Sequence, residues 1–588
     1  MSQIGISSVL KTKNQTLTQQ EEVNVQAVSQ RNQHRYKRIS AGVVALLCSV
    51  GVQAASPDPV SGDLLQQTVP KPVLPQARSL PLVIPTEGVL PDDVTPLPVK
   101  HIVLQGNKIL STETLNSVLE DELDKPGPLS LKRLALLAQL ITNYYHEQGY
   151  FLSRAYVPAQ TLSGDSVTLI ILEAEYGQIT VTNNSRVNDT RLNSYIEPLK
   201  KGEAVKKSSL YRSLLLLEQL PGAKVQAQVA PGANRGETNL LIDAQSTAPY
   251  EAQLNLDNAG NQASGRVRLS GQITVNSPWQ LGDELTANVL SSGVGLNFLQ
   301  GGYSAPVNGM GTRVGGELSW LQYNLQGSFS SLDAEGNAAA LGLWVEHPLL
   351  LTNNALANVR VTGNHKQFED TMTGTFDRQR ELQSLMVTLA ASRRLQDWGV
   401  VSASLATKFG QLNLQDSVSR NFDAVTARSN GNYLTWNLAL AFSQNLPSGD
   451  RLYAGFRAQH SGDNLDSSEQ FQLGGMGNLP GYELGTISGS SGTLATLALR
   501  HDVTYSWLPQ GRWEGELFFD AGRVKVNAKP WTTGSNKASL YDAGLGLTWT
   551  GANQWQVHTE IAQYIGKVEA LAGSKPDLQA WLRISKGF

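Results

Sequence analysis

The sequence predicts an all-β membrane barrel of 16 antiparallel strands that follows two small α+β domains. From Tyr250 to Phe588 no helical periodicity lasts for more than about one turn, and segments of about 8–14 residues alternate apolar and polar side chains. Glycine, asparagine, aspartate, serine and proline separate these segments, as they do in turns. The region before Tyr250 repeats one order of strands and helices, which predicts two copies of a small domain.

The first 55 residues have the order of a secretory signal. A polar tail ends in a basic cluster at 35–38, an apolar run follows at 39–52, and the small residues Ala54 and Ala55 come next. The alternative, a transmembrane anchor, would need about 20 apolar residues, and this run has about 14. We therefore interpret residues 1–55 as an extended signal peptide.

Composition narrows the classes of protein that the exported part can belong to. Cys48, the single cysteine, lies in the signal, so the exported chain is no disulfide scaffold. A formal net charge of −3 does not favour a nucleic-acid partner. After residue 55 no apolar run is long enough to cross a membrane as a helix, which leaves a periplasmic, a secreted or a β-barrel protein.

Residues 56–98 contain ten of the 25 prolines. Proline fixes φ and removes a hydrogen-bond donor, so this stretch is predicted to be an extended, semi-rigid linker. Within it, Gly62 to Thr68 could form a short helix that plugs the barrel, or could be a few ordered residues in a disordered linker.

Two similar units follow, at 99–175 and 176–248. The first alternates like a strand at 99–104, has helical spacing at 111–119 and 129–146 with Ser111 and Ser130 as N-caps, and has strands at 153–157 and 167–172. The second repeats the order, with strands at 178–181, 225–229 and 238–242 and helices at 191–199 and 208–220. Exposed sheet edges and helix–sheet grooves on such units are surfaces where an extended peptide can add a strand.

The barrel, residues 249–588, contains an even number of predicted strands, as bacterial outer-membrane barrels do. The predicted strands lie near 250–257, 265–275, 283–290, 296–306, 311–322, 338–347, 357–367, 381–394, 397–410, 432–444, 450–460, 493–504, 513–523, 538–550, 554–564 and 577–588. Trp320, Tyr323, Trp507, Trp549 and Trp555 are expected in an interfacial girdle. The alternative, a soluble sandwich or propeller, would need a repeating blade motif, which the sequence does not contain.

Between two of these strands lies a long glycine-rich loop, residues 461–492. Its part from Leu473 to Gly492 has too much glycine for a helix and is too long for a tight hairpin. We expect it to fold into the barrel lumen; the alternative is a disordered extracellular loop. About 25 residues later, Asp520 interrupts an apolar strand and shares its face with Phe518 and Gly522, so it should point into the lumen.

Several short motifs resemble those of two-partner secretion outer-membrane transporters, the TpsB family of the POTRA-containing barrel superfamily. The first unit carries Tyr145-x-x-x-Gly149-Tyr150 and Ser153 to Gln160, and the second carries Leu220-Pro221-Gly222 and Gly236-Glu237-Thr238. The barrel adds Leu256 to Gly260, Gly265-Arg266, Asn276-Ser277-Pro278, Gly282-Asp283 and Gly302 to Pro306. The resemblance runs from about residue 99 to 588.

The resemblance implies a pore in the Gram-negative outer membrane with its POTRA domains in the periplasm. It would recognise an unfolded, exported partner and secrete it through the barrel. Its other partners would be outer-membrane lipid and the barrel-assembly machinery, which reads a terminal aromatic residue such as Phe588. The alternatives are an outer-membrane assembly or insertion factor of the same superfamily and a passive porin or receptor.

In this superfamily the loop after the eleventh strand carries a Val-Arg-Gly-Tyr/Phe tip, and its arginine pairs with the aspartate of Phe-x-Asp-x-Gly on the thirteenth strand. The positions that match the tip are Leu479, Pro480, Gly481 and Tyr482, and those that match the strand are Phe518, Asp520 and Gly522. Proline replaces the arginine, and no lysine or arginine lies between Arg457 and Arg500. We therefore expect the tip to dock near Asp520 through neutral hydrogen bonds, a wall arginine or lysine to pair with Asp520, and the latch to be neutral, indirect or absent.

No catalytic site, metal site or cofactor is predicted. The eight histidines lie at least 18 positions apart, and neither a dinucleotide fingerprint nor a phosphate loop is complete. We therefore predict that the chain is not an enzyme. The sequence leaves open which partner is secreted, the oligomeric state and the energy source.

Overall fold

The fold is known from a computed structural model. The structure describes residues 60–70, 74–76, 82–83, 91–161, 165–372, 376–396, 398–505, 508–567, 569–573 and 577–588. The predicted signal peptide, residues 1–55, lies outside the described residues. None of the described helices is both long and apolar enough to cross a membrane.

Residues 99–175 form a three-stranded sheet with two helices. The elements are β2 (His101–Gln105), α3 (Thr112–Leu123), α4 (Leu131–Glu147), β3 (Arg154–Tyr156) and β4 (Ser166–Leu172). Strand β4 is central, parallel to β2 and antiparallel to β3. The predicted N-caps are confirmed, because the side chains of Ser111 and Ser130 accept hydrogen bonds from backbone N–H groups of the helices that follow them.

Residues 176–248 follow with the same order of elements. They are β5 (Glu175–Asn184), α5 (Asp189–Ile196), α6 (Lys207–Glu218), β6 (Ala223–Pro231) and β7 (Glu237–Ser246). Strand β7 is parallel to β5 and antiparallel to β6. The linker adds a fourth strand, β1 (Leu82–Val83), parallel to β6.

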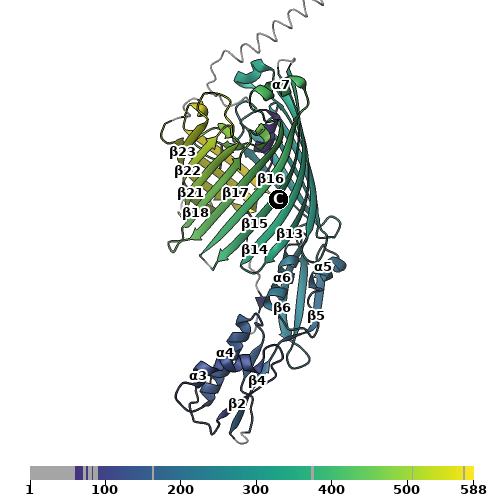
Figure 1. Ribbon diagram of the computed structural model, residues 1–588, viewed down its shortest axis with the longest axis vertical. Helices are drawn as coiled ribbons and strands as arrows, with labels where there is room; N and C mark the ends of the chain where they lie inside the picture. Colours follow the sequence, from purple (N-terminus) through teal and green to yellow (C-terminus); the bar gives the residue numbers. More distant parts are fainter. Residues whose placement is uncertain are drawn as a thin grey trace, which may run out of the picture. The chain divides into compact units, whose positions relative to one another are not determined.

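The rest of the chain is a closed barrel in which sequential strands pair and β25 pairs with β8, antiparallel (Figure 1). The strands are β8 (Tyr250–Asp257), β9 (Arg268–Asn276), β10 (Glu284–Ser291), β11 (Leu296–Pro306), β12 (Arg313–Asn324), β13 (Glu335–Leu351), β14 (Ala355–Met372), β15 (Phe376–Leu395), β16 (Gly399–Leu414), β17 (Gly431–Asn445), β18 (Arg451–Ser461), β21 (Ser491–Val503), β22 (Arg512–Lys525), β23 (Lys537–Thr550), β24 (Trp555–Tyr564) and β25 (Gln579–Gly587). The prediction of 16 antiparallel strands is confirmed.

Side chains alternate between the lumen and the outer face, as they must on a strand. On β13, Leu341, Leu343 and Val345 are exposed on the outside, whereas Ala338 is buried inside. Of the predicted girdle, Trp507 lies outside the described residues. Trp320 is exposed on the outer face, but the girdle prediction for Tyr323 is wrong. Tyr323 lies three positions further along β12, so it faces the lumen instead.

The strands β13 to β16 have 17, 18, 20 and 16 residues and are longer than predicted. A tilted strand crosses a membrane in about 9–11 residues, so these strands continue past the hydrocarbon layer. Apolar alternation marks the part of a strand that faces lipid. The alternation therefore predicted the part of each strand that crosses the membrane and missed the polar residues that extend β13 to β16 beyond it.

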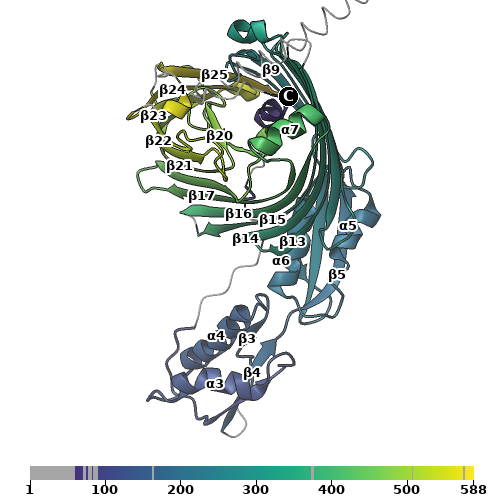
Figure 2. The same cartoon turned by 45° about the horizontal axis from the view of Figure 1, so that its top comes forward.

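The lumen contains the loop 461–492 and the linker helix α2 (Ser61–Thr68). The loop includes the 3-10 turn η2 (Ser467–Glu469) and the antiparallel pair β19 (Phe471–Leu473) and β20 (Ile487–Gly489). Figure 2 shows β20 and the purple helix α2 within the ring of strands. Other connections carry η1 (Gly327–Leu332), α7 (Ser417–Val425), η3 (Ala552–Gln554) and η4 (Ala570–Ala572).

Candidate functional site

Helix α2 lies inside the barrel with its apolar side against the wall. Leu64 and Leu65 are buried in a cluster that includes Phe368 and Leu382 of the wall and Leu465 of the loop. The helix has 8 residues, and a helix shorter than about 12 residues is marginal by itself in water. Packing in the lumen therefore stabilises it. Of the two possibilities for this stretch, the short helix is the one that forms, and we call α2 the plug helix.

The plug helix rests on the lumen loop. Gln66 Nε2 donates to the carbonyl oxygen of Gln470 at 2.8 Å, and Gln472 Nε2 donates to Asp63 Oδ1 at 3.1 Å. At Gly62 the contact is so close that a Cβ would lie 2.8 Å from Ser467 Oγ. The helix and the loop thus share a tightly packed interface.

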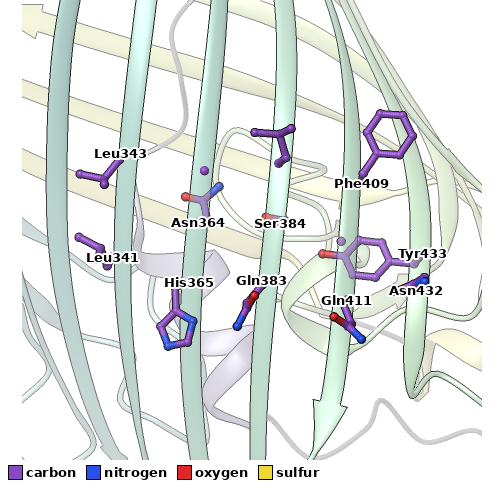
Figure 3. Close-up of a pocket in the computed structure, with 13 residues that line it drawn as sticks. Leu341, Leu343, Asn364, His365, Gln383, Ser384, Phe409, Gln411, Asn432 and Tyr433 are labelled. Atoms are coloured by element: carbon purple, nitrogen blue, oxygen red, sulfur yellow. The ribbon is translucent and has the colours of Figure 1, made fainter.

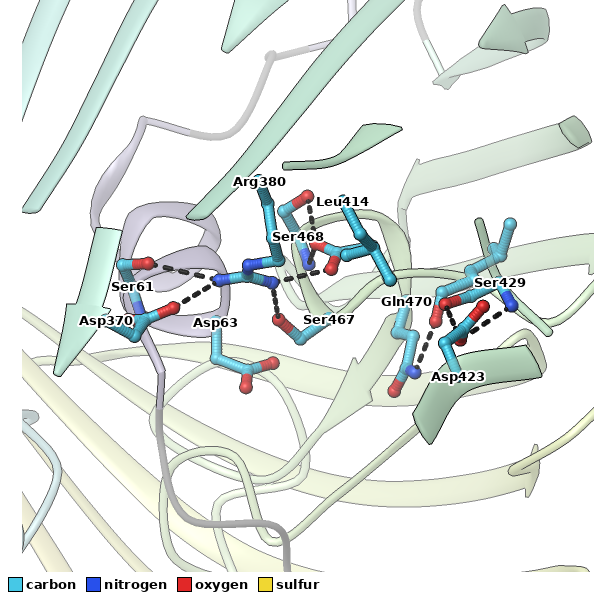
Figure 4. Close-up of polar contacts among 12 residues, drawn as sticks. Ser61, Asp63, Asp370, Arg380, Leu414, Asp423, Ser429, Ser467, Ser468 and Gln470 are labelled. Atoms are coloured by element: carbon cyan, nitrogen blue, oxygen red, sulfur yellow. Dashed lines mark hydrogen bonds and ion pairs between the residues drawn. The ribbon is translucent and has the colours of Figure 1, made fainter. Parts of the chain in front are cut away.

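Arg380 of β15 joins the wall, the loop and the plug helix (Figure 4). Its Nη2 lies 2.7 Å from Asp370 Oδ2 of the wall, and its Nη1 lies 2.5 Å from Asp466 Oδ2 of the loop. Nη2 also donates to Ser61 Oγ at 3.1 Å, and the Ser61 N–H donates to Asp370 Oδ1 at 2.9 Å. The guanidinium is completely buried, so both carboxylates depend on it for a counter-charge.

A second ion cluster holds the loop at Glu469. Its carboxylate oxygens lie 2.8 Å and 2.5 Å from the Nζ atoms of Lys366 and Lys408 on the wall. Burial by itself would raise the pKa of Glu469, but the two ammonium groups lower it to about 2. Burial likewise opposes ionisation of Asp466, and Arg380 brings the pKa of that carboxyl group down to about 2.

The two other acidic residues of the loop also have cationic partners. Asp463 lies 2.9 Å from Lys529 Nζ, and Glu483 forms an ion pair with Arg266. The prediction of a neutral, indirect or absent latch concerned the loop tip, and outside the tip the loop is held by ion pairs. The loop contains no cation, but it contributes the anions and the barrel contributes the cations.

The loop tip, residues 479–482, is nevertheless held by neutral contacts. Leu479 and Tyr482 are buried, and Trp581 Nε1 of β25 donates to the carbonyl oxygen of Pro480 at 2.8 Å. The hydroxyl group of Tyr482 donates to the backbone oxygen of Tyr541 at 3.4 Å. None of these contacts requires the arginine that the family motif has at the position of Pro480.

The carboxylate that receives the tip is Asp542 of β23. The backbone N–H of Gly481 donates to Asp542 Oδ2 at 2.5 Å. A Cβ on Gly481 would lie 2.6 Å from the Cβ of Asp542, so a larger residue there would move the tip away from the wall. Asp542 is directly opposite Asp520 in the sheet, one strand further along than the sequence predicted for the docking site.

Asp520 is buried on the lumen side of β22 and accepts a hydrogen bond from the Thr496 hydroxyl group. The expected ion pair with a wall cation is not seen, since no described lysine or arginine pairs with Asp520. Arg457 of β18 is the wall cation whose charge acts on Asp520, but its hydrogen bond goes to Asn478 of the loop. A wall cation is thus present without forming an ion pair, and the Thr496 hydroxyl group donates directly to Asp520.

The two other residues of the strand motif also face the lumen. Phe518 is buried against Ala498 and Ala562. Gly522 provides room for the loop, because a Cβ there would lie 2.6 Å from Leu473 Cδ1. The strand motif therefore contacts the loop at Gly522, where the absence of a side chain leaves room for Leu473. The aspartate of the motif contacts the neighbouring strands instead.

Phe588 lies where the barrel closes. Its backbone N–H donates to the carbonyl oxygen of Ala252 at 2.9 Å, and its ring, under Lys586 Nζ at 4.0 Å, is exposed. Its role as an assembly signal stays a prediction.

A cavity of about 780 Å³ lies in the barrel wall across β13 to β17 (Figure 3). Leu341, Leu343 and Phe409 line it and are exposed on the outer face, and Gly363 and Gly410 leave the wall without side chains there. The lining also includes Tyr433, which belongs to the buried cluster of Leu64 and Leu465, so the cavity lies beside the part of the wall that holds the helix and the loop.

Sequence reasoning missed Asp542, Trp581 and Arg380. Asp542 could have been found, because it interrupts an apolar strand as Asp520 does. Arg380 looked like an ordinary charge near a strand end, and its partners are 10, 86 and 319 positions away in the chain. No local pattern indicates contacts of that range.

Comparisons with known proteins agree with this architecture. A family model described as haemolysin secretion/activation protein ShlB/FhaC/HecB matches residues 236–549, and a model of the ShlB-type POTRA domain matches residues 97–174. The chain is 27% identical over 544 residues to the heme/hemopexin transporter protein HuxB of Haemophilus influenzae, which covers 90% of this chain and 91% of HuxB. It is 23% identical over 503 residues to the hemolysin transporter protein HpmB of Proteus mirabilis, covering 82% and 84% of the two chains.

Among solved structures, CdiB from Escherichia coli has the same fold, with a TM-score of 0.69 at 20% identity over 87% of this chain and 94% of that one. The first family model spans more than half of the chain. The barrel lies in the outer membrane with its POTRA domains in the periplasm, and the chain belongs to the haemolysin secretion/activation protein family of two-partner secretion transporters.

Proposed function

We propose that this chain secretes one large exoprotein, unfolded in transit, through its barrel after its two POTRA domains have recognised that protein in the periplasm. The observation that carries the proposal is the occupied lumen. A short helix and a loop fill the barrel and are held by hydrogen bonds and ion pairs, which can be broken without unfolding the strands. A polypeptide could pass once these elements move.

The POTRA domains have sheet edges on which an unfolded chain could add a strand. In the first domain, β2 and β3 are the edge strands of the sheet β2-β4-β3. In the second, β5 is an edge strand, and the linker strand β1 is at the opposite edge. Strand addition relies on backbone hydrogen bonds and tolerates many sequences, which suits a long unfolded partner. Binding in a helix–sheet groove would serve the same purpose.

The named relatives are described as a heme/hemopexin transporter protein, HuxB, and a hemolysin transporter protein, HpmB. For this chain we propose an exoprotein of the same general kind, whether haemolysin, adhesin or toxin. We also propose that the chain acts as a transporter and not as an enzyme, that lipid surrounds the barrel, and that the barrel-assembly machinery inserts it through a signal that includes Phe588.

Deletion of the protein tests the proposal. We expect one large exoprotein to remain in the periplasm while other outer-membrane barrels assemble normally. A general loss of outer-membrane proteins would instead favour the assembly or insertion factor. Normal secretion together with loss of a small solute's uptake would favour the porin or receptor.

A variant without residues 61–68 separates the plug from the pore. We expect this variant to conduct ions continuously in planar bilayers, whereas the full chain opens rarely. Equal conductance of the two proteins would contradict a plug role for α2.

A further inference from the structure

Asp63 is the one acidic residue of the plug helix, and it is buried. It accepts hydrogen bonds from Gln472 Nε2, at 3.1 Å, and from the Val60 N–H, and it forms no ion pair with a described residue. A buried carboxylate without a cation of its own is unfavourable, and protonation is the usual way to relieve that cost.

The charges around Asp63 are already engaged with one another. Arg380, the nearest cation, is bound by Asp370 and Asp466, and Figure 4 shows the carboxyl group of Asp63 turned away from the guanidinium. Strand β13 contributes uncharged residues such as Ala338 to this part of the lumen. The titratable and charged groups of the other elements around α2 are Asp466 and Glu469 of the loop, Lys366 and Asp370 of β14, Arg378 and Arg380 of β15, Lys408 of β16, Tyr323 of β12 and Tyr433 of β17.

This environment favours the protonated form of Asp63 while the helix is docked. Burial raises the pKa of Asp63 to about 7 from an ordinary 3.8, and the neighbouring Asp466 carboxylate adds to the rise, against the opposing effect of Arg380. A released helix exposes Asp63 to water and returns the pKa toward its ordinary value. The docked state therefore binds a proton that the released state gives up.

We propose that Asp63 is a proton-controlled switch: the plug helix stays in the lumen while the Asp63 carboxyl group is protonated and is released more readily once that group is ionised. The inference rests on the proposed role of α2 as the plug of a secretion pore. The sequence places no other acidic residue in the helix, and Asp466 and Glu469 stay ionised through the whole neutral range because their pKa values are about 2.

The direction of the pH dependence follows from linkage. Above about pH 5, where Asp466 and Glu469 stay ionised, docking weakens as the pH rises, by up to about tenfold per unit, and levels off above about pH 7. Between about pH 5.5 and about pH 8.5 the docking equilibrium should fall roughly thirtyfold.

The test is single-channel recording of the purified full-length protein at about pH 5.5, 7 and 8.5. We expect the wild-type protein to open more often as the pH rises, and Asp63→Asn to open rarely at every pH because its side chain is never charged. Asp121→Asn, on the exposed surface of α3, is the matched control and should keep the wild-type profile. A flat wild-type profile, or Asp63→Asn with the wild-type rise, would overturn the switch.

A second measurement follows the helix itself. A cysteine at position 64 is buried in the docked helix and should react with a maleimide faster as the pH rises, relative to a cysteine at the exposed position 95. Asp63→Asn should remove that relative increase. If secretion is lost without this protein but both pH profiles are flat, the switch is wrong and the proposed function stands. If the profiles are as expected but secretion is normal without this protein, the switch stands and the proposed function is wrong.

Discussion

The base and the tip of the lumen loop are held by different kinds of contact. At the loop base, residues 466–472, the carboxylates of Asp466 and Glu469 are buried against three wall cations. At the loop tip, residues 479–482, the chain is held by backbone groups, the Trp581 indole and close packing. Ion pairs therefore hold the base, and neutral hydrogen bonds and close packing hold the tip.

This difference has consequences for opening. Removing one partner of an ion pair that is buried in the lumen strongly destabilises the docked loop, because the other partner is left without a counter-charge. Contacts of the tip are neutral on the loop side and depend on Gly481, whose missing side chain lets the tip approach Asp542. We therefore expect the tip to release before the base, and the plug helix to stay with the base.

Arg380→Met should have the largest effect. It leaves the carboxylates of Asp370 and Asp466 buried without their cation. The free energy that docks the loop and the plug helix should fall by about 3–5 kcal/mol. We expect frequent channel openings and a lower temperature for loss of the compact barrel band on gels. Arg154→Met, on the exposed face of β3, should change neither quantity; an unchanged channel in Arg380→Met would show that the base is not held by charge.

Acid should loosen the base next. The folded pKa values of Asp466 and Glu469 are about 2, below their ordinary values of 3.8 and 4.5. Their contribution is therefore complete above about pH 5 and is lost as the pH falls toward 2, on the order of 2–3 kcal/mol for each group. Protease cleavage of the loop, measured after brief acid exposure, should increase only in that range.

Gly481→Ala should disturb the tip and leave the base in place. The new Cβ would lie 2.6 Å from the Cβ of Asp542, and moving the tip to relieve that contact would break the hydrogen bond of the 481 N–H group. We expect a loss of about 1–3 kcal/mol, seen as faster labelling of a cysteine at position 479. Gly462→Ala is the control, because a Cβ there meets nothing within 4 Å.

Glu483→Gln should have the smallest effect. Its ion pair with Arg266 joins side chains that are 40% and 45% exposed, so water and salt screen it. We expect less than about 1 kcal/mol and no change in channel opening at physiological salt. An effect as large as that of Arg380→Met would mean that exposed and buried ion pairs stabilise the docked loop equally. That result would contradict the expectation that the buried pairs at the base dominate.

Much of the fold could be predicted because its signals are local. Two-residue alternation marks each crossing strand, and serine before an apolar periodic stretch marks a helix start, as Ser111 and Ser130 do. The candidate site was predicted less well. Its loop and its lumen-facing aspartate were found, but the acceptor for the tip was placed on Asp520 instead of Asp542, one strand away.

By itself the sequence determined the number of strands, the alternation of their faces, the glycine-rich tip and the absence of a cation in the loop, because each depends on neighbours along the chain. Only the tertiary structure decided what the loop and the plug helix are bound to. Arg380 meets Asp466 and Ser61 across 86 and 319 residues of chain, and such a contact depends on how the barrel closes. The cations that hold the lumen loop lie on the barrel strands and connections, far from the loop along the chain.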